Sequence, residues 1–142
     1  ASRLTGGSIS GRDKNMYTYK LIGYSGVRMR RQDELGELNY GRNMVLTNIE
    51  WRFPIVSDLN YYMWYMFPDF LFRSFYGVFF VDVGLAWNDE EPKLENSLYS
   101  YGVGLRFHTF ILQTFPFSLN FIWAYSPVND KTEFYFLFGP VF

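Results

Sequence analysis

Residues 75–88 read FYGVFFVDVGLAWN, and this stretch decides the fold class. From Phe79 onward its odd positions carry large apolar side chains, whereas the even positions include Asp82, Gly84 and Ala86. Alternation with a period of two is typical of a β-strand with one apolar face. The stretch is more than twice as long as the ~5–6 residues usual for a strand in a soluble protein. We therefore predict a long strand with one apolar and one small or polar face.

Other segments repeat this alternation, and they are residues 43–56, 97–112, 116–126 and 132–142. A strand of about 12 residues is ~40 Å long and, tilted by ~40°, covers about 30 Å of membrane height. Longer polar links alternate with a short turn between the segments, as in outer-membrane barrels. The predicted fold is thus all-β, an antiparallel transmembrane β-barrel.

The number of predicted strands is too small for a complete barrel. Membrane barrels begin at about 8 strands, so we expect this chain to form only part of one, about five to six C-terminal strands. The partner strands would come from the same polypeptide or from another chain, because an open edge in lipid leaves backbone groups unpaired. The first residue, Ala1, leads us to expect a removed leader or the tail of a longer chain.

Composition excludes several classes of protein. The 142 residues are 23% aromatic and 49% hydrophobic, with a net charge of −1 and a mean hydropathy of −0.10. A disordered chain would lack these aromatics, and a helical membrane protein needs about 20 consecutive apolar residues per span. The charge gives no support for nucleic-acid binding. With no cysteine and one histidine, we expect no disulfide, metal site or cofactor.

The chain changes character at residue 43. Residues 1–42 are rich in Gly, Ser, Asn and charge, and we predict a lumen or surface loop region with possible short strands near 16–30 and 35–41. Residues 43–142 are predicted to hold the transmembrane strands. Within them, residues 58–74 carry apolar side chains at helical spacing, which predicts a membrane-hugging excursion at the periplasmic interface.

The chain ends on alternating aromatic residues. Phe134, Phe136, Phe138 and the terminal Phe142 are similar to the assembly signal of bacterial outer-membrane barrels, from which Pro140 departs. The alternative is an ordinary apolar terminal strand.

A series of short motifs suggests a family. They are LIGYSG at 21–26, NIEWRFP at 48–54, FFVDVG at 79–84, YGVGLR at 101–106 and FLFGPVF at 136–142. In order and spacing the chain resembles the C-terminal part of the surface-antigen barrel family, which includes BamA-like assembly proteins, TamA-like translocation proteins and two-partner secretion transporters. The resemblance implies a bacterial-type outer membrane, contact with its lipid, and insertion or translocation of client proteins.

The resemblance also implies a lid loop. In that family an Arg-Gly-Phe/Tyr tip folds into the lumen, and its Arg meets acidic residues on the inner strand faces. Here Ile22, Gly23 and Tyr24 match the tip, with Ile22 in place of Arg, while Glu50 and Asp82 match the acids. Two facing carboxylates repel and require a cation between them.

Several cations are candidates for that role. Lys20, Arg28, Arg30 and Arg31 flank the tip, and Arg106 lies on the next strand. The predicted lumen network is Glu50, Arg52, Asp82 and Arg106; the alternative is a solvated network without a lid function. The Arg28, Arg30 and Arg31 cluster precedes acidic residues, so we interpret it as a solvated charged loop rather than a phosphate or lipopolysaccharide site.

Catalysis is not expected. His108 shares a strand face with Ser100, but the two lie eight residues apart, ~27 Å along a strand. We therefore predict no enzyme and interpret His108 as a polar lumen side chain. Two functional alternatives remain. One is a passive pore, anchor or scaffold in an envelope complex, which Ile22 favours. The other is a soluble barrel for a lipophilic ligand.

Overall fold

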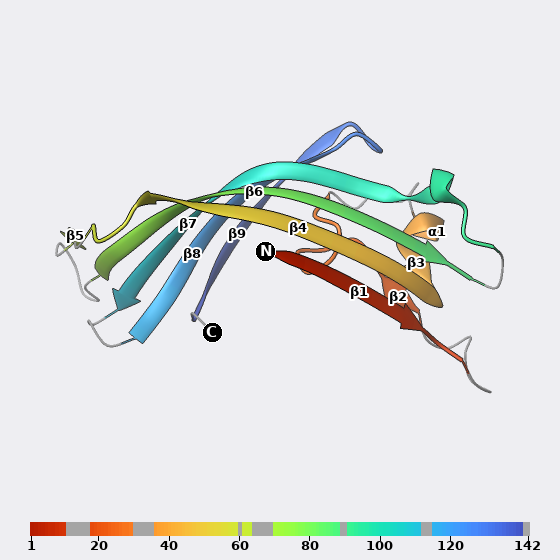
Figure 1. The fold of residues 1–142 in the computed structure, drawn as a ribbon, viewed down its shortest axis with the longest axis horizontal. Helices are drawn as coiled ribbons and strands as arrows, with labels where there is room; N and C mark the ends of the chain where they lie inside the picture. Colours follow the sequence, from red (N-terminus) through yellow and green to blue (C-terminus); the bar gives the residue numbers. More distant parts are fainter. Residues whose placement is uncertain are drawn as a thin grey trace. The chain divides into compact units, whose positions relative to one another are not determined.

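A seven-stranded antiparallel sheet dominates the computed structural model (Figure 1). The structure describes residues 1–10, 18–29, 36–59, 61–63, 70–88, 91–111 and 115–140. The strands are β1 (Ser2–Ser8), β4 (Asn43–Val56), β5 (Tyr61–Met63), β6 (Phe70–Trp87), β7 (Leu98–Ile111), β8 (Phe115–Ser126) and β9 (Lys131–Pro140). Their order is β1-β4-β6-β7-β8-β9, with β5 beside β6. Within the described residues the sheet is open, and β1 and β9 are its edges.

A small sheet accompanies the large one. It pairs β2 (Tyr19–Lys20) with β3 (Tyr40–Gly41). Strand β3 directly follows the short helix α1 (Gly36–Asn39). A turn of 3-10 helix, η3 (Leu94–Asn96), lies between β6 and β7. Among the residues the structure places, no helix is long and apolar enough to cross a membrane.

The predicted long strands are present, with one correction. Strand β6 begins at Phe70, and Tyr61–Met63 pair with Phe70–Phe72. Strand β6 thus begins before residue 75, and the described part of residues 58–74 includes paired strands despite its helical spacing; the membrane-hugging excursion stays a prediction. Aromatic side chains favour strands, and backbone hydrogen bonds such as Leu59 N to Arg73 O (2.9 Å) hold the chain extended.

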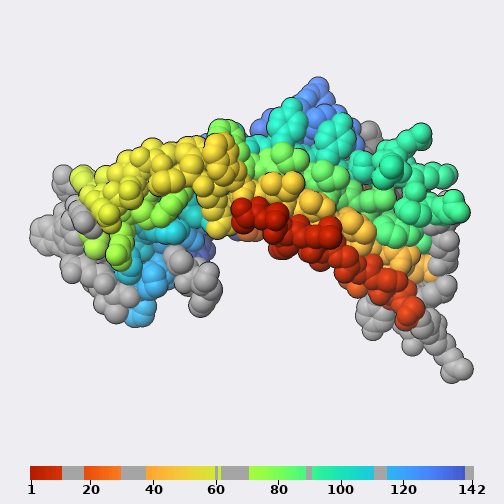
Figure 2. Space-filling view, in the orientation of Figure 1, coloured from red at the N-terminus to blue at the C-terminus, as the bar shows by residue number. Residues whose placement is uncertain are grey.

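The N-terminal region needs a second correction. We interpreted residues 1–42 as loop with possible strands further along; β2 and β3 lie in those ranges, but β1 was not foreseen. It pairs with β4 from Ser2↔Ile49 to Ser8↔Asn43, and Figure 2 shows β1 along the edge of β4. Its TGGS run has little strand preference of its own, so the long neighbouring strand supplies the partner. The division at residue 42 stays a prediction.

The two faces of the sheet follow the predicted alternation. On the outer face, Val81, Val83 and the other odd-numbered apolar side chains of β6 beyond Tyr76 are half-buried or exposed. On the inner face, Phe80, Asp82 and Ala86 are buried. The apolar strand face predicted from the sequence is thus the outer face of the sheet.

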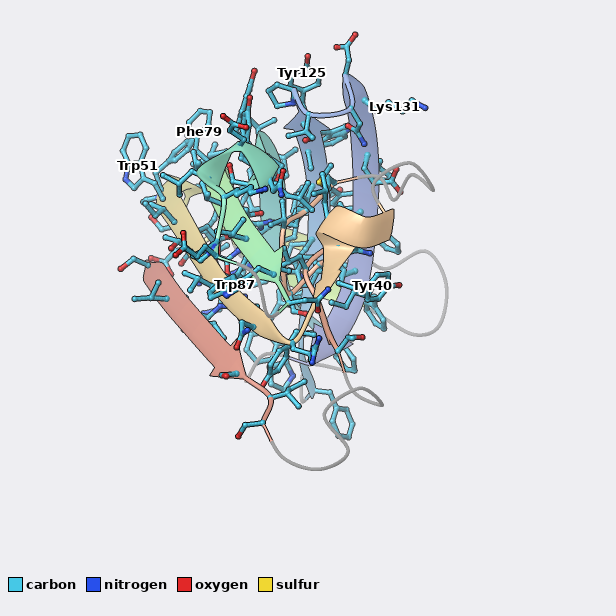
Figure 3. The ribbon with its side chains drawn as sticks, turned by 90° about the vertical axis from the view of Figure 1, so that its right-hand side faces the viewer. Tyr40, Trp51, Phe79, Trp87, Tyr125 and Lys131 are labelled. Carbon is cyan, nitrogen blue, oxygen red and sulfur yellow. The ribbon has the colours of Figure 1, made fainter. Side chains whose placement is uncertain are left out.

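Two compact units make up the chain. The loop unit comprises Ala1–Glu50, Phe80–Gly102 and Ala124–Glu133, and the aromatic unit comprises Trp51–Phe79, Val103–Trp123 and Phe134–Phe142. The core of the loop unit is aliphatic and consists of Leu21, Ile22, Val27, Met29, Leu46, Ala86 and Leu98. The aromatic unit is rich in ring contacts; Figure 3 shows Trp51 and Phe79 side by side, pointing away from the ribbon.

Candidate functional site: a loop locked to the barrel wall

The site is built by residues 21–29, here called the lock loop, which fold onto the inner face of the loop unit. Backbone bonds shape the loop: Val27 N donates to Leu21 O (2.8 Å) and Gly23 N donates to Val27 O (3.1 Å). Asn39, at the end of α1, holds the loop's first residues, accepting Leu21 N at its carbonyl (3.0 Å) and Ile22 N at its side-chain oxygen (2.7 Å). The lock loop is therefore an ordered part of the fold.

Two glycines make this close packing possible. A Cβ at Gly84 of β6 would lie 2.8 Å from Val27 Cγ2 and 3.1 Å from Leu21 Cδ2. A Cβ at Gly26 would lie 1.9 Å from Leu21 O, inside contact distance. The loop touches the wall because position 84 has no side chain, and it turns tightly because position 26 has none.

A buried ion pair joins the lock loop to β6. Arg28 and Asp82 are 5% and 0% exposed. They meet in a bidentate arrangement, Nε to Oδ2 at 2.8 Å and Nη2 to Oδ1 at 3.0 Å, and the Arg28 backbone N–H also donates to Oδ2 (3.2 Å). Such paired, charge-assisted bonds are among the strongest in proteins. Each buried charge thus has its counterpart.

Two neighbours complete the surroundings of the ion pair. Asn48 of β4 donates its Nδ2 to Asp82 Oδ1 at 2.8 Å. The Arg28 guanidinium carbon lies 3.6 Å from the centroid of the Phe80 ring, a cation–π arrangement that is strengthened by burial. Asp82 therefore accepts bonds from the loop and from the adjacent strand, so the site links loop, β4 and β6.

The lid-loop prediction can be compared with these contacts residue by residue. Asp82 does meet a loop cation, but the cation is Arg28, not a residue at the tip. Ile22 lies in the aliphatic core instead, and Tyr24 is exposed. The interpretation of Arg28 as solvated is wrong, because the carboxylate buried on β6 draws the guanidinium inward. Arg30 and Arg31 lie outside the described residues.

The predicted lumen network falls in two units. Glu50 and Asp82 belong to the loop unit, and Arg52 and Arg106 belong to the aromatic unit. Asn48, two positions before Glu50 in β4, is the side chain that bonds Asp82. In the aromatic unit, Arg106 Nε donates to Asn120 Oδ1. The four-residue network stays a prediction.

The C-terminal phenylalanines and His108 were the other predicted features. Phe134, Phe136 and Phe138 are exposed at alternate positions of β9; Phe142 lies outside the described residues, so the assembly signal stays a prediction. The His108 ring is 5.1 Å from that of Tyr76. In the part of the chain that the structure describes, no three His, Cys, Asp or Glu side chains cluster as a metal site would require.

Asn48 was not among the predicted site residues, because the acidic role on that strand was assigned to Glu50. The signal that was available is the even position of Asn48, which places it on the same face as Glu50. Chemically, the site is a contact that holds a loop on a wall.

Comparison with known protein families identifies the family of this chain. Residues 5–142 match the family model of the Omp85 superfamily domain. The chain belongs to the Omp85 superfamily. No curated protein and no solved structure matches it in the corresponding searches. Omp85 proteins are outer-membrane β-barrels of bacteria and organelles, so the open sheet is part of such a barrel. The family resemblance found in the sequence is confirmed.

Proposed function

We propose that this Omp85 chain takes part in the insertion or translocation of proteins at a bacterial-type outer membrane, without being an enzyme. The observation that carries the proposal is the buried Arg28–Asp82 pair, which fastens a nine-residue loop to the inner wall at residues 21–29. A loop fixed there controls what passes the lumen. The loop is closed in the structure, with both charges of the pair buried, and in this proposal the closed state is the resting state.

The edges of the sheet supply the second element of the mechanism. Strand β9 is an edge in the described residues, and an edge strand presents backbone groups that can pair with another strand. A client strand can add to such an edge through main-chain hydrogen bonds. In this proposal the gate lies at β9, the lock loop acts as the lid, and lipid covers the outer face.

The scaffold alternative was favoured by the absence of Arg at the loop tip, position 22. Arg28 provides the guanidinium from six positions further on and makes a bidentate contact with Asp82. A passive pore or scaffold is therefore one outcome of the test rather than a second proposal.

The test replaces the full-length native protein in the cell by its Asp82→Asn variant. The abundance of other folded barrel proteins in the outer membrane is then counted. We expect a general loss of barrel proteins, because the amide leaves the Arg28 charge uncompensated. Glu95→Gln, at an exposed position in η3, is the matched control and should leave the census unchanged. A normal census with folded Asp82→Asn protein would contradict the proposal and support the scaffold.

A further inference from the structure

A second arginine, Arg3, touches the lock loop. Arg3 lies in strand β1, directly across from Asn48 of β4. Its guanidinium donates to Asn48 Oδ1 from Nε (3.1 Å) and from Nη2 (2.7 Å). Nη2 also donates to the carbonyl oxygen of Ser25 in the lock loop. One side chain therefore joins β1 to β4 and to the loop.

Asn48 connects the two arginine contacts. Its oxygen accepts the bonds from Arg3, while its Nδ2 donates to Asp82 Oδ1 (2.8 Å) and to Gly26 O (2.9 Å). The amide thus turns its acceptor toward the cation and its donor toward the carboxylate. The result is a continuous polar chain, Arg3–Asn48–Asp82–Arg28, from β1 to the lock loop.

This chain depends on the register of β1 and β4. A slip by one residue would move every β1 side chain to the opposite face and take Arg3 away from both Asn48 and Ser25. A slip by two residues would restore the face but displace Arg3 by ~6.8 Å, beyond hydrogen-bond distance. Only the native register allows the three bonds.

We propose that Arg3 and Asn48 form a register sensor: the lock loop closes fully only when β1 is paired with β4 in the native register, and displacement of β1 releases it. This inference goes beyond the proposed function, because it concerns the loop and its own barrel and needs no client protein. Its consequence is that loop release follows from movement of β1 relative to β4.

The test uses the absence of cysteine from the chain. Val27 is 0% exposed, so Val27→Cys, in a background with no cysteine outside residues 1–142, introduces a thiol that reacts with a maleimide only when the lock loop opens. Labelling is measured in the full-length protein and scored only in the heat-modifiable, folded gel band, so misfolded molecules do not count. We expect Arg3→Gln to raise the labelling rate about tenfold, the effect of losing charge-assisted hydrogen bonds. Arg73→Gln, at an exposed arginine of β6, should change nothing.

A second arm separates register from the loss of a bond. Disulfides in the Val27→Cys background link Leu4→Cys either to Thr47→Cys, its native partner, or to Ile49→Cys, a shift of two residues. Oxidation consumes both added thiols and leaves Val27→Cys as the reporter. The native link should keep this thiol protected, and the shifted link should raise its labelling about tenfold. Equal protection in both registers, or no effect of Arg3→Gln, would overturn the proposal.

Discussion

The loop unit and the aromatic unit use the same strand period but stabilise their strands by different contacts. In the loop unit, Asp82 is fully buried and paired with Arg28 under an aliphatic core. In the aromatic unit, rings stack across strands, as in Phe75 on Phe107 at 4.3 Å and Phe117 on Phe138 at 4.8 Å. Buried charges tolerate little displacement, whereas ring pairs accept several geometries. The loop unit is thus specific in its contact geometry, and the aromatic unit tolerates changes in it.

Glycine has a corresponding role in each unit. Gly84 leaves room for the lock loop, and Gly77 leaves room for a ring, since a Cβ there would lie 2.3 Å from Phe53 Cζ. The lock loop can contact the strand only in the geometry that keeps its hydrogen bonds, whereas a ring can tilt and keep its contact. The comparison predicts a steep order of mutational effects, from the ion pair to single hydrogen bonds.

The largest effect is expected at the ion pair. Asp82→Ala leaves Arg28 buried without its counter-charge and should destabilise the folded barrel by about 3–5 kcal/mol. The measurement is the unfolding temperature in cold-versus-boiled gels. The double variant Arg28→Leu with Asp82→Leu should recover most of that loss, because no buried charge remains. An unchanged unfolding temperature in Asp82→Ala would remove the distinction between the units.

The second effect concerns the seat of the loop. Gly84→Ala places a Cβ against Val27 and should cost about 1–3 kcal/mol by overpacking, read as a lower unfolding temperature in cold-versus-boiled gels. Gly139→Ala is the matched control, since a Cβ at Gly139 would meet nothing within 4 Å. Similar behaviour of the two variants would show that the lock loop does not rest on position 84.

The third effect tests the tolerance of the aromatic unit. Phe107 contacts Phe72, Phe75 and Phe121 with ring centroids 6.3, 4.3 and 5.9 Å away. Because leucine keeps apolar contact with the three rings, Phe107→Leu should cost about 0.5–1.5 kcal/mol in total, read as urea-induced unfolding in lipid vesicles. Phe115→Leu, at a 56% exposed position, serves as the comparison. A cost for Phe107→Leu above that of Asp82→Ala would reverse the ranking of the units.

The smallest effect is expected at a single neutral hydrogen bond of the loop unit. Ser126 Oγ donates to Tyr99 O at 2.7 Å and is buried. Ser126→Ala should cost about 1 kcal/mol, measured in the same urea series. A larger loss would indicate that neutral contacts, and not only the ion pair, make the loop unit specific.

Much of the sheet was predictable, because one-sided burial imposes a period of two on the sequence. The alternation placed Asp82 on the inner face and Val81 and Val83 on the outer face, and the structure agrees. Two regions escaped this reasoning. The TGGS run of β1 has no apolar period, and residues 58–74 show a helical spacing that the antiparallel pairing of β5 with β6 overrides.

The site was predictable only in part. Asp82 required a cation, and Arg28 was among the candidates, but sequence position favoured the loop tip. Which cation arrives depends on the turn at Gly26 and on the backbone bonds of the loop, which bring residue 28 over β6. The contacts of Arg3 and Asn48 depend on the register of two strands that lie some 45 residues apart in the chain.

The sequence by itself determined the strand period, the two faces, the membrane-length strands and the family, because each depends on residues close together in the chain or on their order. The tertiary structure decided the partner of Asp82, the place of β1 and the connection of β1 to the lock loop. Those contacts join residues far apart in the chain, and their geometry exists only once the strands are paired and the loop has folded onto them.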